Sequence, residues 1–382
     1  MSQPVPRMPF TLPGPFRPAA EFGVLRAEGA VSRVRTVAGH EAWLVTRYAE
    51  VRELITDKRL GSEPRPGRAG YTDQYVPDLH GWQERRNLLR PLFAARRMRE
   101  FAPVVTQLAQ RYVAEAARAS PPADLHAAIS VDYPLAVLYA FLGFPGDERR
   151  DWLMGLMRGV CDATDPERAS TASRRLMAWI REMTRTWQDD PGSGALALLC
   201  QRADADAVAS VTVALILGAS STTTICIDLA ALLMLGDQEQ WEELARRPEL
   251  VVKAVEEALR MSFFGGGGVR RFAVEQIDIG GVVIRPGDEV LLDFGVANYD
   301  DIEFPEPCRF DARRAGGGHL SFGHAGRFCS GAPLARLELQ ALFGELTRQL
   351  PGARLAEPLE SIPFQGEMFI SGVARLPITW GP

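Results

Sequence analysis

The segment Phe322-Gly-His-Ala-Gly-Arg-Phe-Cys-Ser-Gly-Ala-Pro-Leu-Ala-Arg336 decides the fold of this 382-residue chain. A glycine-broken loop in this segment ends at Cys329 and continues directly into a strong helix pattern. The amino end of a helix carries partial positive charge and free backbone N–H groups, which stabilise a thiolate. Such a thiolate is a soft ligand for iron. The pattern therefore indicates metal ligation by Cys329, although a single cysteine is more often a small buried apolar residue.

The composition is that of an ordinary globular protein, with 46% hydrophobic and 24% charged residues. The formal net charge of −5 provides no bulk basic field, so we expect no nucleic-acid partner. The five cysteines are odd in number and lack CxxC spacing, which disfavours a disulfide framework or a zinc site and favours a reducing cytoplasm.

Membrane insertion is not expected either. Residues 1–18 are rich in proline and lack the apolar core of a signal peptide. The most apolar run, 211–235, is interrupted by glycine, serine, threonine and aspartate, so it predicts a buried helix and not a bilayer span.

The periodicity of apolar residues predicts a mostly α fold of the α+β class. Helical spacing dominates residues 81–259, and a second helix pattern runs from Cys329 to about residue 350. Alternation predicts a hairpin at 31–46 and short strands over 269–296. We therefore expect one helix-rich domain over 1–382 with small β-sheet modules, whose first 20 residues are extended.

The cysteine segment resembles the haem-ligand loop of cytochromes P450. The family pattern Phe-x-x-Gly-x-(Arg or His)-x-Cys-x-Gly is filled here by Phe322, Arg327, Cys329 and Gly331, whereas Ala325 stands where the family has glycine. The resemblance covers essentially the whole chain. It implies a soluble bacterial P450 with haem b, in which Cys329 is the axial ligand of the iron.

Two further motifs of the resemblance concern the protein beneath the haem. Glu257-Ala-Leu-Arg260 is similar to the Glu-x-x-Arg that the family carries about seventy residues before its cysteine, and Glu257 precedes Cys329 by 72 positions. In the family this pair locks to an arginine of a later segment, for which Arg314 is the candidate. The implied role of these three residues is structural.

The resemblance also supplies partners for the haem propionates, because buried carboxylates need donors. Trp82 and Arg86 are four apart, so their side chains share one helix face and both are pure donors. Arg271 and Arg327 match further propionate-binding positions, and His319 matches the run into the cysteine loop.

Residues 217–224, Leu-Gly-Ala-Ser-Ser-Thr-Thr-Thr, resemble the oxygen-binding helix of the family, whose pattern is (Ala/Gly)-Gly-x-(Asp/Glu)-Thr. The alignment makes Thr222 the oxygen-activating alcohol, puts Ala219 in place of glycine and puts Ser221 in place of the acid. A serine hydroxyl relays protons but does not supply them near neutral pH. Asp228 lies seven residues further on a similar face, about 10 Å along the axis, so it substitutes only through waters.

The substrate pocket that the resemblance implies has several candidate walls. They are the 61–80 loop, Leu217 and Gly218 of the oxygen-binding helix, Val269, and the pair Phe369 and Ile370.

The resemblance implies a haem-thiolate oxidoreductase of secondary metabolism that uses O₂ and two electrons from a ferredoxin and its reductase. Three classes of function remain open. They are monooxygenation, oxidase-type C–C or C–N coupling of aromatic or cyclodipeptide substrates, and non-catalytic haem-thiolate binding or recruitment. Ser221 favours coupling, and Thr222 argues against a non-catalytic role. A small-molecule substrate, a monomer and a cytoplasmic location are expected.

Overall fold

The structure is a computed structural model, and it describes residues 5–14, 16–36, 39–61, 82–144, 149–161, 165–186, 194–262, 268–314, 318–365 and 372–381. The chain divides into two compact units. Unit 1 comprises Met1–Gly81, Glu256–Cys329 and Phe364–Ser371, and unit 2 comprises Trp82–Val255, Ser330–Pro363 and Gly372–Pro382. A single domain over the whole chain stays a prediction.

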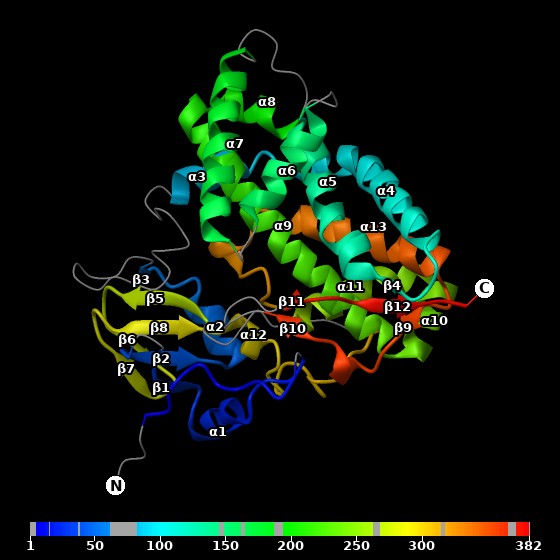
Figure 1. Ribbon diagram of the computed structural model, residues 1–382. Coiled ribbons are helices and arrows are strands. Elements are labelled where there is room, and N and C mark those ends of the chain that lie inside the picture. The colour runs from blue at the N-terminus through cyan, green and yellow to red at the C-terminus, as the bar shows by residue number, and fades with distance from the viewer. Residues whose placement is uncertain are drawn as a thin grey trace. The chain divides into compact units, whose positions relative to one another are not determined.

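Unit 1 is built on a five-stranded sheet of order β1-β2-β8-β5-β3, visible in Figure 1. The hairpin β1 (Val31–Arg35) and β2 (Glu41–Val45) confirms the prediction for residues 31–46. β8 (Glu289–Leu292) runs parallel to β2, and β5 (Val269–Ala273) pairs antiparallel with β8 and with β3 (Leu60–Gly61). The strands β6 (Ile277–Ile279) and β7 (Val282–Ile284) form a separate hairpin.

Short helices complete unit 1. They are α1 (Ala20–Glu28), α2 (Tyr48–Leu54), α12 (Phe294–Ala297) and the 3₁₀ turn η4 (Ala325–Arg327), and α12 packs against α2. The apolar residues of the strands alternate inward and meet Val51, Leu54 and Ile55 of the α2 segment in one core cluster. α2 ends at Leu54, and the chain turns after Ile55 to enter β3.

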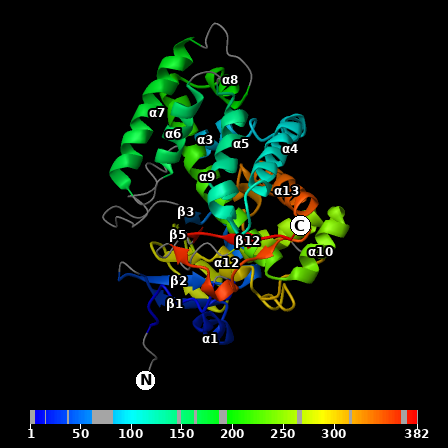
Figure 2. The same ribbon diagram turned by 45° about the vertical axis from the view of Figure 1, so that its right-hand side comes forward.

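Unit 2 is helical. Its helices are α3 (Trp82–Leu89), α4 (Ala95–Ala117), the π-helix η2 (His126–Ser130), α5 (Asp132–Leu142), α6 (Arg150–Val160), α7 (Pro166–Thr186), α8 (Ala195–Cys200), α9 (Ala205–Leu235), α10 (Gln238–Arg246), η3 (Pro248–Leu250) and α13 (Ala332–Gln349). α4 packs along α13, and α7 packs along α6 and α9, as both views show (Figures 1 and 2). α11 (Val251–Met261) begins in unit 2 and ends in unit 1.

The remaining strands are short. β4 (Ala123–Asp124), β12 (Pro377–Thr379) and β9 (Arg354–Leu355) form an antiparallel sheet in unit 2. β10 (Phe364–Gln365), β11 (Gly372–Val373) and the 3₁₀ turn η5 (Leu359–Ser361) complete the list. Helices with small sheet modules are the mostly α architecture that the sequence predicts, and that prediction is confirmed.

α9 is the central helix of unit 2. Asp204 caps its amino end by accepting a hydrogen bond from the Ala207 N–H at 2.8 Å. Among the described residues, α9 is the one helix long and apolar enough to cross a membrane, but 56% of its apolar window is buried inside the protein. Burial against α5, α7 and α10 explains its composition, as expected for the run 211–235.

Asp293 illustrates how burial changes the charge state of a cap in unit 1. It caps α12 by accepting a hydrogen bond from the Val296 N–H at 2.9 Å, and it is almost completely buried. Burial raises the pKa of this carboxyl to about 6. The protonated form is therefore favoured in the folded protein below that pH.

We expect Asp293→Asn to stabilise the protein at neutral pH. Asn makes the same cap but has no charge to bury. Because the folded-state pKa is raised, Asp293 contributes stability below its unfolded pKa and loses that contribution as the pH rises through about 6. The unfolding free energy of the variant should exceed that of the native protein by roughly 3 kcal/mol at pH 7 and by well under about 1 kcal/mol near pH 4, measured by urea unfolding. Equal differences at both pH values would contradict this account.

Candidate functional site

The loop from Phe322 to Cys329 is closed by its own backbone. The N–H of Cys329 donates to the carbonyl of Phe322 at 2.7 Å. Gly323 has a positive φ of 75°, and a Cβ there would lie 2.7 Å from the Arg327 carbonyl oxygen, so the loop requires glycine at this position. Cys329 is exposed in this arrangement, which leaves its sulfur accessible for ligation.

Arg327 of this loop and Arg271 of β5 have no carboxylate partner among the residues that the structure describes. Arg327 donates to the Leu60 carbonyl at 2.7 Å, and Arg271 of β5 donates to the neighbouring Arg270 carbonyl at 2.7 Å. Burial, together with the positive charge of Arg327, lowers the pKa of Arg271 to about 10. Nε of Arg271 is buried without a hydrogen-bond partner among the described residues. Two desolvated, mutually repelling guanidinium groups fit a ligand with anionic groups, such as the propionates that the sequence predicts.

The structure gives less information about the other residues predicted to lie near the haem, which are Trp82, Arg86 and His319. Arg86 lies half-buried on α3, while the side chain of Trp82 lies outside the described residues. His319 has both ring nitrogens occupied within unit 1: Nδ1 accepts from the Ser321 N–H at 3.3 Å, and Nε2 lies 3.2 Å from a Glu256 oxygen. His319 therefore acts as a packing and hydrogen-bonding residue in this structure, and its contact with a cofactor stays a prediction.

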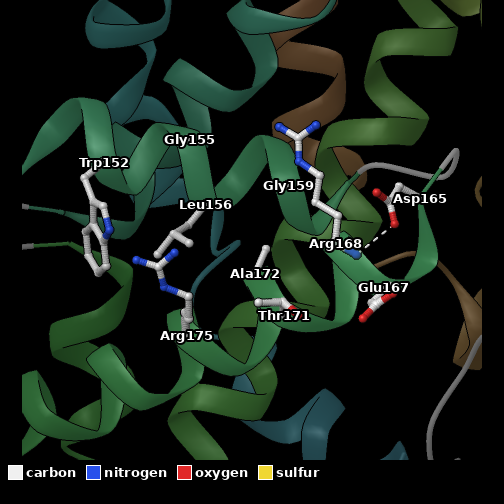
Figure 3. A pocket seen from close by; sticks show the side chains of 10 residues that line it. All are labelled: Trp152, Gly155, Leu156, Gly159, Asp165, Glu167, Arg168, Thr171, Ala172 and Arg175. Atoms are coloured by element: carbon white, nitrogen blue, oxygen red, sulfur yellow. Dashed lines mark hydrogen bonds between the residues drawn. The ribbon is translucent and has the colours of Figure 1, made fainter.

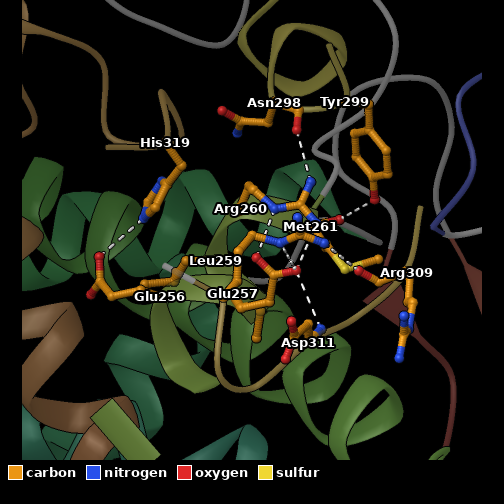
Figure 4. Close-up of polar contacts among 12 residues, drawn as sticks. Glu256, Glu257, Leu259, Arg260, Met261, Asn298, Tyr299, Arg309, Asp311 and His319 are labelled. Atoms are coloured by element: carbon orange, nitrogen blue, oxygen red, sulfur yellow. Dashed lines mark hydrogen bonds and ion pairs between the residues drawn. The ribbon is translucent and has the colours of Figure 1, made fainter. Parts of the chain in front are cut away.

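Figure 4 shows the ion network that the sequence motifs predict around Glu257. Glu257 and Arg260 make a two-fold interaction, Nε to Oε2 and Nη2 to Oε1, both at 2.8 Å. Both side chains are almost fully buried, with 3% and 2% exposed. Arg314 Nε donates to Glu257 Oε1 at 2.8 Å, so the structure brings the three predicted residues together. A carboxylate held by two guanidinium groups satisfies the buried charges mutually.

This network continues toward the cysteine loop through Asn298. Arg260 donates to the Asn298 carbonyl at 2.8 Å. The side chain of Asn298 accepts from the Leu320 N–H at 2.7 Å and donates to the Ser321 hydroxyl at 2.8 Å. Leu320 and Ser321 directly precede Phe322, so the network fixes the start of the loop that ends at Cys329. Asn298 was not singled out from the sequence, because an isolated asparagine carries no pattern.

In unit 2, α9 has an uncovered stripe in the middle of an otherwise buried helix. Ala214, Leu217 and Gly218 are exposed, and Ser221 and Thr222 are half-buried. One helix face carries Ala214, Leu217, Gly218 and Ser221, because successive members of this set are three, one and three residues apart. Leu217 is 41% exposed, which is unusual for an apolar side chain within a core helix. The stripe contains the residues predicted to contact oxygen and substrate.

Thr222 and its neighbours show how this stripe is organised. The Thr222 hydroxyl donates to the Gly218 carbonyl at 2.5 Å, one turn earlier. Such bonds to the preceding turn are typical of threonine within helices. Ala219 is half-buried beside this pair. The Ser221 hydroxyl lies within hydrogen-bonding reach of the Cys161 thiol at the C-cap of α6.

The remaining predicted residues are placed as follows. Gly331 is the N-cap of α13, and Val269 is the half-buried first residue of β5. Phe369, Ile370 and the 62–80 part of the predicted pocket loop lie outside the described residues. Within the described ranges, no group of three or more His, Cys, Asp and Glu side chains is arranged to hold a metal ion.

A cavity of about 580 Å³ lies between α6 and α7 of unit 2. Figure 3 shows its lining, which includes Trp152 and Leu156 from α6 and Arg168 and Arg175 from α7. None of the predicted site residues lines this cavity. It is therefore not the site to which the sequence motifs point.

The structure also pairs two residues that the sequence did not connect. His126 Nδ1 of η2 lies 2.8 Å from Oδ2 of Asp228 on α9. Asp228 is completely buried, and burial raises its pKa. The hydrogen bond to Asp228 raises the pKa of His126. No sequence signal links the two positions, because 102 residues separate them.

Comparison with known proteins gives consistent results. The family model described as cytochrome P450 matches residues 229–350. Pentalenolactone synthase of Streptomyces exfoliatus is 35% identical, covering 98% of this chain and 99% of its own length. Mycinamicin IV hydroxylase/epoxidase of Micromonospora griseorubida is 33% identical, with 95% of each chain covered. The crystal structure of CYP105P1 in complex with filipin I has a TM-score of 0.86 at 30% identity, covering 99% of each chain.

We expect Ala325→Gly to stabilise the cysteine loop slightly. Ala325 has a φ of 45°, in the left-handed region that costs a residue with a Cβ about 1–2 kcal/mol. Glycine removes this cost but adds about 0.5–1 kcal/mol of chain entropy to the unfolded state. The net gain should be about 0.5 kcal/mol in urea unfolding. Ala341→Gly inside α13 is the matched control and should lose about 1 kcal/mol. A loss in both variants would refute the strain at Ala325.

Proposed function

Because this chain belongs to the cytochrome P450 family, and its cofactor is therefore iron protoporphyrin IX, we propose that it is a monooxygenase of secondary metabolism that receives two electrons from a ferredoxin. The observation that carries the proposal is the exposed Cys329 thiol in unit 1, in a loop that also contains one of the two arginines lacking an assigned carboxylate. A haem requires one axial ligand and counter-charges for two propionates. These residues can supply both.

Each residue of unit 1 has a distinct task in this proposal. Cys329 would ligate the iron, and Arg271 and Arg327 would bind the propionates. When bound, the thiolate-ligated haem supplies the redox chemistry that activates O₂. Glu257, Arg260 and Arg314 act as positioning residues, because they hold the backbone that leads into the cysteine loop.

Thr222 and Ser221 of α9 would handle protons. The Thr222 hydroxyl donates to the Gly218 carbonyl, so its lone pairs remain available to accept a second hydrogen bond. When it accepts a proton from a neighbouring hydroxyl or water, it can release its own. Ser221 can relay a proton in the same way, but it cannot serve as its source at neutral pH.

The proposed substrate is a secondary metabolite with a large apolar surface. The exposed Leu217 and the side-chain-free Gly218 provide such a surface on α9. Relatives named for mycinamicin IV and pentalenolactone, and a similar structure that holds filipin I, support this class. Val269, Phe369 and Ile370 are proposed as further contacts.

The proposed electron donor is a ferredoxin reduced by its reductase, and the proposed state is a cytoplasmic monomer. Exposed arginines near the α3–α4 connection, including Arg90 and Arg96, fit an acidic protein partner. Arg96 is also paired with Glu100 at 2.8 Å, so part of its charge is neutralised locally.

Oxidative coupling without oxygen insertion is the second candidate function. The observation in its favour is Ser221, because a site without a local acid delivers protons less readily than one with a carboxyl group. Aromatic and cyclodipeptide substrates are the class to test for this reaction.

We expect the mass of the product to separate the two reactions. The protein is incubated with ferredoxin, reductase and NADPH and a panel of mycinamicin IV, filipin I, biphenyl and tryptophan-containing cyclodipeptides. A gain of 16 Da, the mass of one oxygen atom, is the expected result for monooxygenation. Loss of two hydrogens or a coupled product would replace it with the second candidate. Product formed by peroxide alone, at a matching rate, would remove the ferredoxin from the proposal.

We expect Arg271→Leu to weaken haem retention while stabilising the haem-free protein. The substitution removes a propionate partner, and it also removes the desolvated charge that Arg327 repels. Haem transfer to apomyoglobin should accelerate roughly tenfold, equivalent to about 1.4 kcal/mol of lost interaction. Urea unfolding of the haem-free variant should shift to higher urea. Arg33→Leu, on an exposed arginine of the same sheet, is the control and should change haem transfer little. Unchanged haem transfer in Arg271→Leu would reject the propionate role.

A further inference from the structure

Asp228 is a carboxylic acid at a position where an apolar residue would be expected. It is completely buried on α9, and its neighbours on either side along the helix are Ile227 and Leu229. Burying a carboxylate without full compensation is costly. One oxygen, Oδ2, is bound by His126, whereas Oδ1 is buried without a hydrogen-bond partner among the described residues. This group therefore has one occupied and one unused proton-binding oxygen.

His126 connects the buried carboxyl with solvent. Its side chain is 22% exposed, while that of Asp228 is not exposed at all. Nδ1 is the atom that contacts Asp228, so Nε2 is the ring nitrogen left to exchange protons with water. Because His126 is partly exposed and Asp228 is fully buried, the pair links solvent with the interior of unit 2.

Helix geometry places Asp228 in line with the hydroxyl groups of the uncovered stripe. Ser221, Thr224 and Asp228 are spaced three and four residues apart, so they lie on one face of α9. Successive members of such a row have Cβ atoms about 5–6 Å apart, and one water molecule can bridge polar groups over that range. Asp228 thus lies on the same helix face as the position that carries the acid in the family motif, two turns earlier.

A second contact holds the two elements that carry this row and its solvent link. The Thr224 hydroxyl donates to the Ser130 carbonyl of η2 at 2.9 Å. The Ser130 hydroxyl lies near enough to Asp228 to lower its pKa, and its Oγ is buried with no hydrogen bond to another described residue. The polar groups of Ser130, Thr224 and Asp228 therefore form one cluster within an apolar helix interface.

The charged groups that act on the pair are few. Asp124 of β4 accepts a hydrogen bond from the His126 backbone N–H at 3.1 Å, and its negative charge acts on both His126 and Asp228. Arg375 interacts electrostatically with Asp124. A negative charge beside the pair favours retention of a proton, which suits a donor that must stay loaded near neutral pH.

We propose that His126 and Asp228 supply protons to Ser221 and Thr222, and so perform the task of the acid that is missing at position 221. Asp228 gives a proton from Oδ1 to water beside Thr224, and that proton reaches the Ser221 hydroxyl as Ser221 releases its own toward Thr222. His126 takes a proton from solvent at Nε2 and passes its Nδ1–H to Oδ2 of Asp228. Rotation of the protonated carboxyl and exchange between the two tautomers of the neutral ring restore the starting arrangement. Each cycle moves one proton inward and no electron. The inference rests on the proposed function, because only oxygen activation consumes protons there.

The test compares how the holoenzyme reduces O₂ when it is given ferredoxin, reductase and NADPH but no substrate. With poor proton supply, O₂ and one NADPH with one proton yield hydrogen peroxide. With good supply, O₂ and two NADPH with two protons yield two water molecules. We expect Asp228→Asn to raise peroxide released per NADPH consumed at least threefold. Asp206→Asn, the same substitution at an exposed aspartate of α9, should leave the ratio unchanged.

Two further variants separate proton supply from a structural effect. His126→Gln should raise the peroxide ratio in the same direction, and it serves as the primary variant where Asp228→Asn fails to fold. Adding Ser221→Asp to Asp228→Asn restores an acid at the receiving position and should bring the ratio back to within twofold of the native protein. An unchanged ratio in Asp228→Asn and His126→Gln, or a raised ratio that Ser221→Asp does not lower, would overturn the proposal.

A measurement on the resting holoenzyme tests the pair without turnover. The pKa of His126 is followed by NMR of ¹³C-labelled histidine, with His126→Gln used to assign its signal. We expect this pKa to lie above the ordinary histidine value of about 6.5 in the native protein and in Asp206→Asn, and to fall in Asp228→Asn. A His126 pKa that Asp228→Asn does not change would also overturn the proposal. Neither measurement requires a product, so failure to oxidise the substrate panel would refute the proposed function and leave this result standing.

Discussion

The arrangement of unit 1 depends on the ion pairs that the buried carboxylate of Glu257 makes. This carboxylate forms ion pairs with both Arg260 and Arg314, which lie on two separate segments, and both contacts are 2.8 Å long. Removing one member of such a buried group leaves an uncompensated charge that costs roughly 3–5 kcal/mol. The three charged side chains are therefore stable when all are present, whereas the loss of one of them destabilises the folded protein. Through Asn298 the network also fixes the two residues that precede the cysteine loop.

The arginines near the cysteine loop, Arg271 and Arg327, are partly desolvated without such a pairing among the described residues. The guanidinium group of Arg271 is desolvated and lies within the field of Arg327, and none of the described residues supplies it with a carboxylate. Burial of these charges is therefore electrostatically unfavourable at the residues proposed to hold the haem propionates. Binding of a group with two carboxylates would offset this unfavourable burial, so cofactor retention and stability of the haem-free protein are linked with opposite sign. Unit 1 therefore uses buried charge for support at Glu257, and the role proposed for Arg271 would use it for recognition.

α9 combines two requirements that conflict. It must be apolar to pack against the helices of unit 2, yet the chemistry proposed for its stripe needs hydroxyl groups and protons. The conflict is resolved by local pairing, because the hydroxyls of Thr222 and Thr224 donate to backbone carbonyls. The one carboxyl in the buried part of the helix, Asp228, is matched by a histidine from another element. A polar residue persists in such a helix only with its partner in place.

The sequence by itself determined the family, the mostly α fold and the positions of the main motifs. These are local properties: helical periodicity, the hairpin at residues 31–46, and a cysteine loop whose glycine is required by a positive φ at Gly323. The tertiary structure alone decided which distant residues meet. Neither the role of Asn298 beneath the loop nor the contact of His126 with Asp228 leaves a pattern in the chain, because each depends on segments that folding brings together. Burial, and with it the charge states of Arg271, Asp228 and Asp293, exists only once those segments have packed and excluded water.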